Sequence, residues 1–153
     1  MKKSDIVAAI LEKLREEFDT RRAVSKRTRS AGNDAESKAE SKYDTLSIEE
    51  NYLADGLAKQ AQAAATAAAA YEKFALRDFG PGDAIDRGAL VELEFPDGRE
   101  WFFLGPAGGG IEVAADRKAI TIVTPESPLG GQLMGRKSGG AIAAPRATIR
   151  AVR

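Results

Sequence analysis

The chain contains neither cysteine nor histidine among its 153 residues. Without cysteine it has no disulfides and no thiolate ligands for zinc. Without histidine it lacks the usual general base and any Ser-His or Cys-His catalytic pair. Lys and Arg together number 23, as do Asp and Glu, so no net charge favours nucleic acid or a membrane. Because its short apolar start is soon interrupted by charges, the N-terminus resembles neither a signal peptide nor a spanning helix, and we expect a cytoplasmic protein.

Glycine and proline are scarce in the first half of the chain and frequent in the second. Only two of the 15 glycines and none of the 6 prolines precede Gly80. The segment Asp78–Asp83 reads as a helix stop followed by a turn. We therefore predict an α+β fold with a helical domain over residues 1–78 and a strand-rich domain over residues 82–153.

Two long helical segments, Ser4–Ser30 and Ser47–Leu76, are predicted in the first domain. The first has apolar residues at helical spacing, and the second opens with a capping box in which Ser47 pairs with Glu50. The two helices are expected to form an antiparallel coiled-coil hairpin with its tip at about residues 31–46. The predicted seam of the second helix is Leu53, Leu57, Ala61, Ala64, Ala68 and Tyr71.

The second domain is predicted to be a small antiparallel sheet with one short helix. Apolar or alternating runs between turn residues are typical of strands. The predicted strands are 89–95, 100–104, 119–123 and 147–152. Ser127 and Pro128 precede a predicted short helix that extends to Met134, because proline suits the first helical position. The expected core residues are Phe95, Trp101, Phe102, Phe103 and Ile122.

Two charged segments of the hairpin are candidates for chemistry. A polar break is predicted over residues 33–50, and it carries six acidic residues against two lysines. Neighbouring carboxylates bind hard cations such as Mg²⁺, although this composition is also typical of a solvated interhelical loop. A basic stretch of the first helix is suited to phosphate contacts or, alternatively, to a solvated helix face. Its residues are Arg21, Arg22, Lys26, Arg27 and Arg29.

The segment Ile120–Gly139 reads ITIVTPESPLGGQLMGRKSG. It resembles the C-terminal signature of the Gre family (GreA/GreB-like) of bacterial transcript cleavage and elongation factors, in which a strand and Ser-Pro precede a short helix ending in Leu-x-Gly-Lys-x-x-Gly. Gly88–Val91 is similar to the start of the family's first C-terminal strand, and Tyr43 with the acids before it resembles the end of the tip motif. The resemblance covers nearly the whole chain.

The resemblance implies an FKBP-like second domain that docks on RNA polymerase and a hairpin that enters the secondary channel. In the family, two tip acids help to hold a second Mg²⁺ at the polymerase active site, where a backtracked transcript is hydrolysed. Such a factor is not itself an enzyme and has no intrinsic cofactor. It meets RNA, through the basic stretch, and template DNA only within the elongation complex, and no membrane is implied. The implied docking residues are Ser127, Pro128, Leu129, Leu133, Met134, Gly135 and Lys137.

At the tip the chain departs from the family pattern Gly-Asp-x-x-Glu-Asn-x-Glu-Tyr. Aligned on Tyr43, Glu36 takes the place of the first acid, while Ala39 takes that of the second and Glu40 follows one residue later. Glu36 and Glu40 are therefore the candidate catalytic acids and, in complex with polymerase, the candidate metal ligands. On a helix they would lie one turn apart on one face, a spacing suited to sharing a cation.

Two alternatives remain open at this point. The altered tip suggests a Gre-like regulator that occupies the channel without stimulating cleavage. The predicted sheet with its aromatic residues is also compatible with an FKBP-like protein-binding module.

Overall fold

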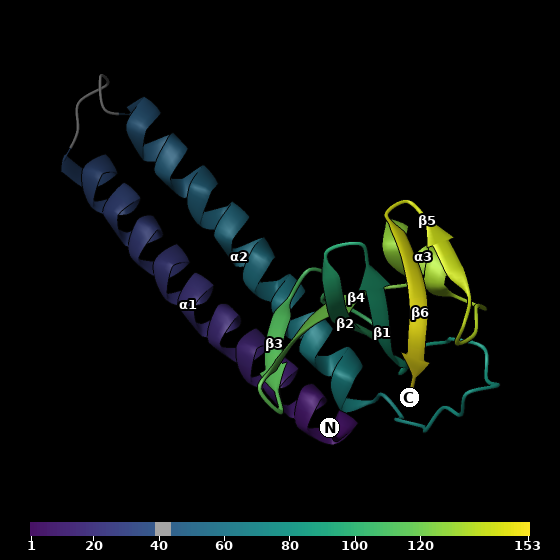
Figure 1. The fold of residues 1–153 in the computed structure, drawn as a ribbon. Coiled ribbons are helices and arrows are strands. Elements are labelled where there is room, and N and C mark those ends of the chain that lie inside the picture. The colour runs from purple at the N-terminus through teal and green to yellow at the C-terminus, as the bar shows by residue number, and fades with distance from the viewer. Residues whose placement is uncertain (39–43) are drawn as a thin grey trace. The chain divides into compact units, whose positions relative to one another are not determined.

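The computed structural model describes the backbone of residues 1–38 and 44–153, and the side chains of residues 1–29 and 51–153. Two long helices, α1 (Lys3–Lys38) and α2 (Asp44–Glu72), run side by side in opposite directions (Figure 1). A mostly antiparallel six-stranded sheet with one short helix follows them. The predicted fold class is thereby confirmed.

The chain divides into two compact units. The hairpin unit is Lys13–Thr66, and the sheet unit combines Met1–Glu12 with Ala67–Arg153. The first turns of α1 and the last turns of α2 thus belong to the sheet unit. Within the described ranges, no helix is both long and apolar enough to cross a membrane.

Both helices extend into the predicted polar break. Helix α1 continues beyond Ser30 to Lys38, and α2 begins at Asp44, ahead of Ser47. The bounds predicted for the break, residues 33–50, and the helix start predicted at Ser47 are therefore wrong. The segment is rich in Ala, Glu and Lys, which are strong helix formers, and it contains no proline that would end a helix. Residues 39–43 lie outside the described part of the chain.

The buried seam of α2 differs from the predicted one at its N-terminal end. Ala61 and Ala64 are buried as expected, but Leu53 is 58% exposed, and the adjacent Ala54 is fully buried. The hydroxyl of Ser25 in α1 donates a 2.7 Å hydrogen bond to the carbonyl oxygen of Ala54. This bond brings a side chain of α1 against the backbone of α2, and the small side chain of Ala54 leaves room for that approach.

The sheet has four of its strands where the sequence predicts them. Its strands are β1 (Leu90–Phe95), β2 (Gly98–Leu104), β3 (Glu112–Ala115), β4 (Lys118–Val123), β5 (Ala141–Ala143) and β6 (Arg146–Val152), in the order β3-β4-β2-β1-β6-β5. The short edge strands β3 and β5 are not predicted from the sequence. Strands β2 and β4 pair in parallel, and all other neighbours pair antiparallel. A parallel pair needs a connection of about a dozen residues or more, which the segment containing β3 supplies.

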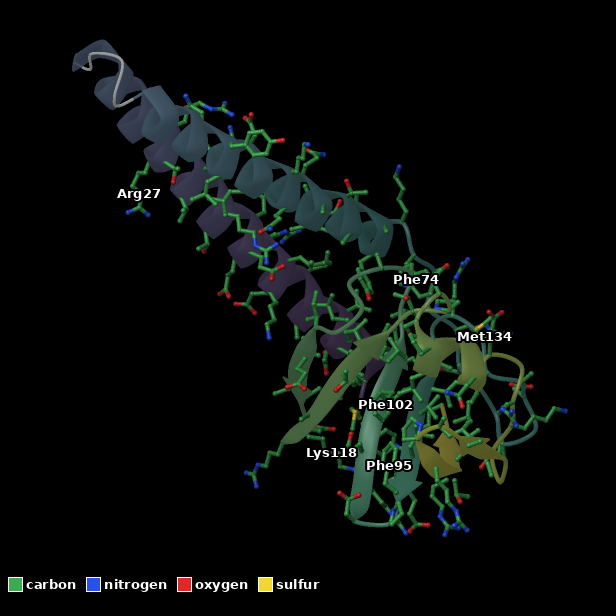
Figure 2. The ribbon with its side chains drawn as sticks, turned by 90° about the horizontal axis from the view of Figure 1, so that it is seen from above. Arg27, Phe74, Phe95, Phe102, Lys118 and Met134 are labelled. Atoms are coloured by element: carbon green, nitrogen blue, oxygen red, sulfur yellow. The ribbon has the colours of Figure 1, made fainter. Side chains whose placement is uncertain are left out.

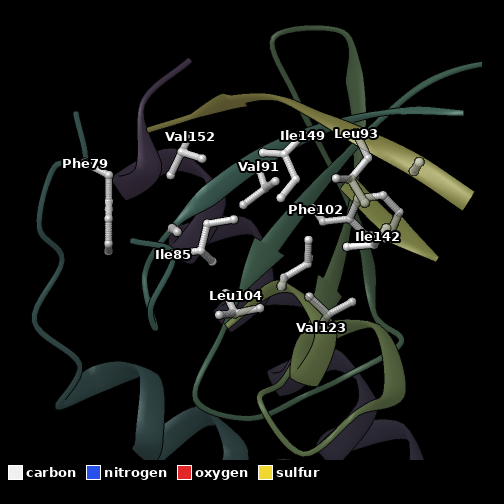
Figure 3. Packing of buried hydrophobic residues seen from close by; sticks show 13 residues of the cluster. Phe79, Ile85, Val91, Leu93, Phe102, Leu104, Val123, Ile142, Ile149 and Val152 are labelled. Atoms are coloured by element: carbon white, nitrogen blue, oxygen red, sulfur yellow. The ribbon is translucent and has the colours of Figure 1, made fainter. Parts of the chain in front are cut away.

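Large apolar side chains are buried on both faces of the sheet. One face carries the main cluster (Figure 3), which includes Phe79, Ile85, Val91, Leu93, Phe102, Leu104, Val123, Leu133, Ile142, Ile149 and Val152. On the other face Trp101 and Phe103 of β2 are buried, as the alternation of side chains along a strand requires. The predicted core residues are confirmed, with Phe95 only partly buried at the edge of the cluster.

Tyr71, near the end of α2, is fixed against the loop that follows β2. Its hydroxyl donates a 2.6 Å hydrogen bond to the carbonyl oxygen of Ala107. A Cβ at Gly105 would lie 2.1 Å from the tyrosine oxygen, so only glycine leaves room for the ring. Burial of the hydroxyl raises the pKa of Tyr71 well above its ordinary value.

Candidate functional site

The helix α3 (Pro128–Leu133) begins at the predicted Ser-Pro pair. Ser127 has an extended backbone, and its Oγ accepts a 3.1 Å hydrogen bond from the Gly130 N–H. The same hydroxyl donates a 2.7 Å hydrogen bond to the carbonyl oxygen of Thr124. Pro128 occupies the first helical position, where a missing N–H costs nothing. Ser127 therefore closes the turn after β4 and sets the direction of α3.

Of the two adjacent glycines in α3, Gly130 cannot be replaced by a residue with a side chain, whereas Gly131 can. A Cβ at Gly130 would lie 1.8 Å from the carbonyl oxygen of Thr124, which forbids any side chain there. At Gly131 the nearest atom to a Cβ is the carbonyl oxygen of Pro125, at 3.4 Å, which is an ordinary contact. Gly130 thus allows α3 to pack closely on the turn that precedes it.

The end of α3 is tied to the segment before β1. Gly135 has a left-handed backbone with φ of 78°, and its N–H donates a 2.8 Å hydrogen bond to the Ile85 carbonyl oxygen. The Ile85 N–H in turn donates a 2.7 Å bond to the Arg136 carbonyl oxygen. A residue with a side chain would be strained at this φ, so Gly135 shapes the turn after α3.

The predicted docking residues fall into two groups. Ser127 caps α3, Gly135 shapes the turn after it, and Leu133 is fully buried. Four others remain accessible: Pro128 and Lys137 are exposed, while Leu129 and Met134 are partly buried against the main cluster. Figure 2 labels Met134. We refer to Pro128, Leu129, Met134 and Lys137 as the α3 surface.

Gln132 holds α3 to the turn between β5 and β6, a role for which the sequence contains no signal. Its Nε2 donates a 2.5 Å hydrogen bond to the Ala144 carbonyl oxygen, and its Oε1 accepts a 3.4 Å bond from the Ala144 N–H. From the sequence alone, a glutamine on a short helix is expected to be solvated, because its partner at Ala144 is distant in the chain. This paired contact keeps the α3 surface in a defined position on the sheet.

The five basic residues predicted to meet RNA have different environments. Arg21 pairs with Glu17 at 3.2 Å, and Arg29 pairs with Asp55 of α2. The guanidinium of Arg22 lies 5.7 Å from the centre of the Phe18 ring. Lys26 and Arg27 are exposed, and Figure 2 labels Arg27 on the hairpin.

These five residues do not share one helix face. At about 100° per residue, Arg22, Lys26 and Arg29 lie within roughly 60° of one another around α1. Arg27 lies at least about 100° from each of them, and Arg21 lies next to the buried side of the helix. We refer to Arg22, Lys26 and Arg29 as the basic row.

Tyr52 is a candidate contact residue that was not predicted from the sequence. It is 81% exposed, and it lies one turn before Asp55, the carboxylate that binds Arg29 of the basic row. An exposed aromatic ring near cationic side chains is typical of surfaces that bind single-stranded nucleic acid, because bases stack on the ring. The sequence offered one signal for this role, because Tyr52 lies outside the predicted seam of α2 and an aromatic residue there is expected to be exposed.

The candidate tip acids are not placed by the structure. The backbone of Glu36 belongs to α1, but its side chain lies outside the described residues, as does all of Glu40. Among the described residues there is no group of three or more acidic side chains arranged to hold a metal ion. The proposed role of the two acids therefore stays a prediction from the sequence.

Comparisons with known proteins gave similar solved structures, among them two of the factor Gfh1. No protein-family model matches the chain, and no curated protein matches it. The crystal structure of GreA factor homolog 1 (Gfh1) of Thermus thermophilus is 18% identical, with a TM-score of 0.36 over 95% of each chain. A structure described as the transcription factor Gfh1 is 19% identical, with a TM-score of 0.37 over 95% of this chain and 94% of the other. Values this low do not establish membership of a family.

Proposed function

We propose that the protein is a Gre-like transcription elongation factor that binds RNA polymerase in the cytoplasm. The observation that carries the proposal is the segment Ile120–Gly139, whose sequence resembles the family's C-terminal signature. In this proposal the α3 surface docks on the polymerase and the hairpin enters the secondary channel. The tip carboxylates then stimulate cleavage of a backtracked transcript by the polymerase itself.

The structure of α3 supports a docking role. Three residues in and beside α3 have separate structural roles, since Ser127 caps the helix, Gly130 permits the close turn, and Gly135 takes a left-handed backbone. The α3 surface presents the three apolar side chains of Pro128, Leu129 and Met134 and the cation of Lys137. A rigid, partly apolar surface with one charge is suited to binding a protein partner.

The proposed tip chemistry depends on ligands from the partner. Mg²⁺ prefers six oxygen ligands, so Glu36 and Glu40 alone are too few to hold it, and the polymerase must supply the others. When bound there, the ion would polarise the attacking water and stabilise the charge that develops on the phosphate. Glu36 and Glu40 would add carboxylate oxygens at that position.

The basic row supplies a second proposed contact. Phosphate binding by Arg22, Lys26 and Arg29 would hold the extruded RNA along the hairpin, and Tyr52 offers a ring on which a base can stack. This contact has no sequence preference of its own, because it uses phosphates and ring faces.

The docking step is tested by measuring binding of the protein to purified RNA polymerase. We expect Lys137→Glu to weaken binding, because it reverses the charge of the α3 surface. Arg146→Glu makes the same change at an exposed position on β6 and serves as the matched control. Equal binding by both variants and the unaltered protein would remove α3 as the docking element, and no binding at all would reject the proposed function.

The cleavage step is tested on a backtracked elongation complex with labelled RNA. We expect faster cleavage with the protein than with buffer, and loss of that stimulation in Glu36→Gln and Glu40→Gln. Asp97→Asn, in the turn between β1 and β2, removes a carboxylate far along the chain and should leave cleavage unchanged.

A non-cleaving regulator is the second candidate, and Ala39 at the position of the second acid favours it. This candidate predicts polymerase binding with no stimulation of cleavage, and no effect of Glu36→Gln or Glu40→Gln. The two experiments together therefore separate the candidates.

A further inference from the structure

A pocket of about 430 Å³ lies where the first residues of α1, the segment after α2 and the end of β6 come together in the sheet unit. Four cationic side chains line it: Lys2, Lys3, Arg77 and Arg153. The one acidic side chain in the lining is Asp78, and the apolar part comes from Leu76 and Leu90. Its volume lies within the range of small-molecule sites, about 300 to 1,000 Å³.

Three of the four cations, those of Lys3, Arg77 and Arg153, lie against aromatic rings. Lys3 donates a 2.5 Å hydrogen bond from Nζ to the carbonyl oxygen of Arg77, and its Nζ lies 4.6 Å from the centre of the Phe79 ring. The Arg77 guanidinium lies 4.1 Å from the same ring. Arg153 lies 5.4 Å from the ring of Trp101. Such contacts orient a cation without neutralising it, because the ring carries no net charge.

The positive charge of the pocket is only partly balanced. Arg77 reaches Asp86 at 3.8 Å, where both side chains are exposed. Burial lowers the pKa of Lys3, Asp78 acts in the opposite direction, and the smaller effect of Arg77 lowers the pKa again. Lys2 and Lys3 also stand at the start of α1, where the helix dipole disfavours positive charge. An anion in the pocket would offset the positive charge that Asp78 and Asp86 leave unbalanced.

We infer that this pocket binds a small polyphosphate anion. Guanidinium groups bind phosphate oxygens in pairs, and lysine ammonium groups add point charges. An anion with several charges can contact cations contributed by three separate segments of the chain, whereas a singly charged anion cannot balance them. The site belongs to the sheet unit alone and does not depend on polymerase binding.

The chain carries its own reporter for this binding. Trp101 is the only tryptophan, and Arg153 lies against its ring. The probes are inorganic pyrophosphate and a nucleoside diphosphate, titrated at constant ionic strength, with heat and Trp101 fluorescence measured in parallel. Saturable binding of pyrophosphate is expected, and tighter binding of the nucleotide would assign the source of the phosphates to a nucleotide. No saturable binding of either probe would overturn the inference, as would equal affinity for sulfate.

Variants locate the binding. Arg153→Gln and Lys2→Gln should each weaken pyrophosphate binding about tenfold, the loss of one charge-assisted contact. Asp78→Asn should strengthen it, because it removes the acidic side chain of the lining. Lys118→Gln is the matched control, since Lys118 also lies 4.7 Å from the Trp101 ring but does not line this pocket. Equal weakening in the Lys118 variant would place the binding elsewhere and contradict the inference.

Discussion

The hairpin unit and the sheet unit are stabilised by different kinds of contact. Among the hairpin residues whose side chains are described, the buried ones are mostly small, such as Ala54, Ala61 and Ala64, with Leu14 the large exception. The sheet unit buries aromatic and branched side chains on both faces of its sheet. Close packing therefore restricts which residue types many positions of the sheet unit can accept, whereas much of the hairpin can accept any residue that favours a helix. A hairpin of this kind can change its exposed charges and its tip with little effect on folding.

The largest difference between the units is expected from truncating one large apolar side chain in each. Phe103→Ala removes a fully buried ring and should destabilise the sheet unit by about 3 to 5 kcal/mol. Leu57→Ala in α2 should cost about 1 kcal/mol or less, because Leu57 is only half-buried and alanine is a good helix former. Trp101 fluorescence follows unfolding of the sheet unit, and circular dichroism at the helix band follows the hairpin. Similar losses in both variants would contradict the comparison.

The adjacent glycines of α3 test how strongly local packing limits the size of the side chain at one position. Gly130→Ala should cost about 1 to 3 kcal/mol, because the added Cβ meets a backbone oxygen that cannot move away easily. Gly131→Ala should be neutral or should stabilise by up to about 1 kcal/mol, since alanine favours a helix. Chemical denaturation of both variants gives the two values. Equal destabilisation would mean that the backbone of α3 relaxes around the new side chain.

The sequence predicted α3 well, because its start depends on local chemistry. A serine followed by proline predicts a capped helix, and Ser127 and Pro128 occupy those positions. Which glycine of the Gly130–Gly131 pair is required depends on the position of the Thr124 carbonyl, which no local pattern contains. The aromatic core of β2 was likewise predictable from its run of large apolar residues.

Features that join distant segments were not predictable in the same way. The position of the α2 seam depends on Ser25, which binds the backbone at Ala54 from the other helix. The pocket cations come from residues at both ends of the chain and after α2. In sequence each of them resembles an ordinary solvated charge. The tip acids remain predictions from the sequence, because their side chains lie outside the described residues.

A smaller effect is expected for the one buried polar contact described within the hairpin unit. Ser25→Ala removes the hydrogen bond to the Ala54 carbonyl and should destabilise the hairpin by about 1 kcal/mol. Thr66→Ala also removes a hydroxyl that donates to a carbonyl, that of Gln62 at 2.9 Å, but this bond is exposed and within one helix. That control should be neutral or slightly stabilising. Thermal melting followed by circular dichroism at the helix band compares the two variants. Equal melting temperatures would show that the Ser25 hydrogen bond does not stabilise the pairing of the helices.

The smallest expected effect concerns a charged contact on the surface of the sheet. Hydrogen bonds from Arg150, and then from Arg99 at 3.2 Å, hold the pKa of Glu94 below its ordinary value. The pKa of Glu94 is lower in the folded protein than in the unfolded chain, where it lies at about 4 to 5. These bonds therefore stabilise the protein at pH values above the unfolded pKa, and this stabilisation is lost as the pH falls through the folded pKa. Glu94→Gln should therefore melt slightly earlier than the unaltered protein at pH 7, and the difference should vanish at about pH 2.

High salt provides the control for this last prediction, since about 1 M NaCl screens exposed charges and should shrink the difference at pH 7. A difference that persists at about pH 2 would show that Glu94 acts through packing rather than through its charge. The contact is small because all three side chains reach water, whereas the large effects in the sheet unit come from side chains that water does not reach.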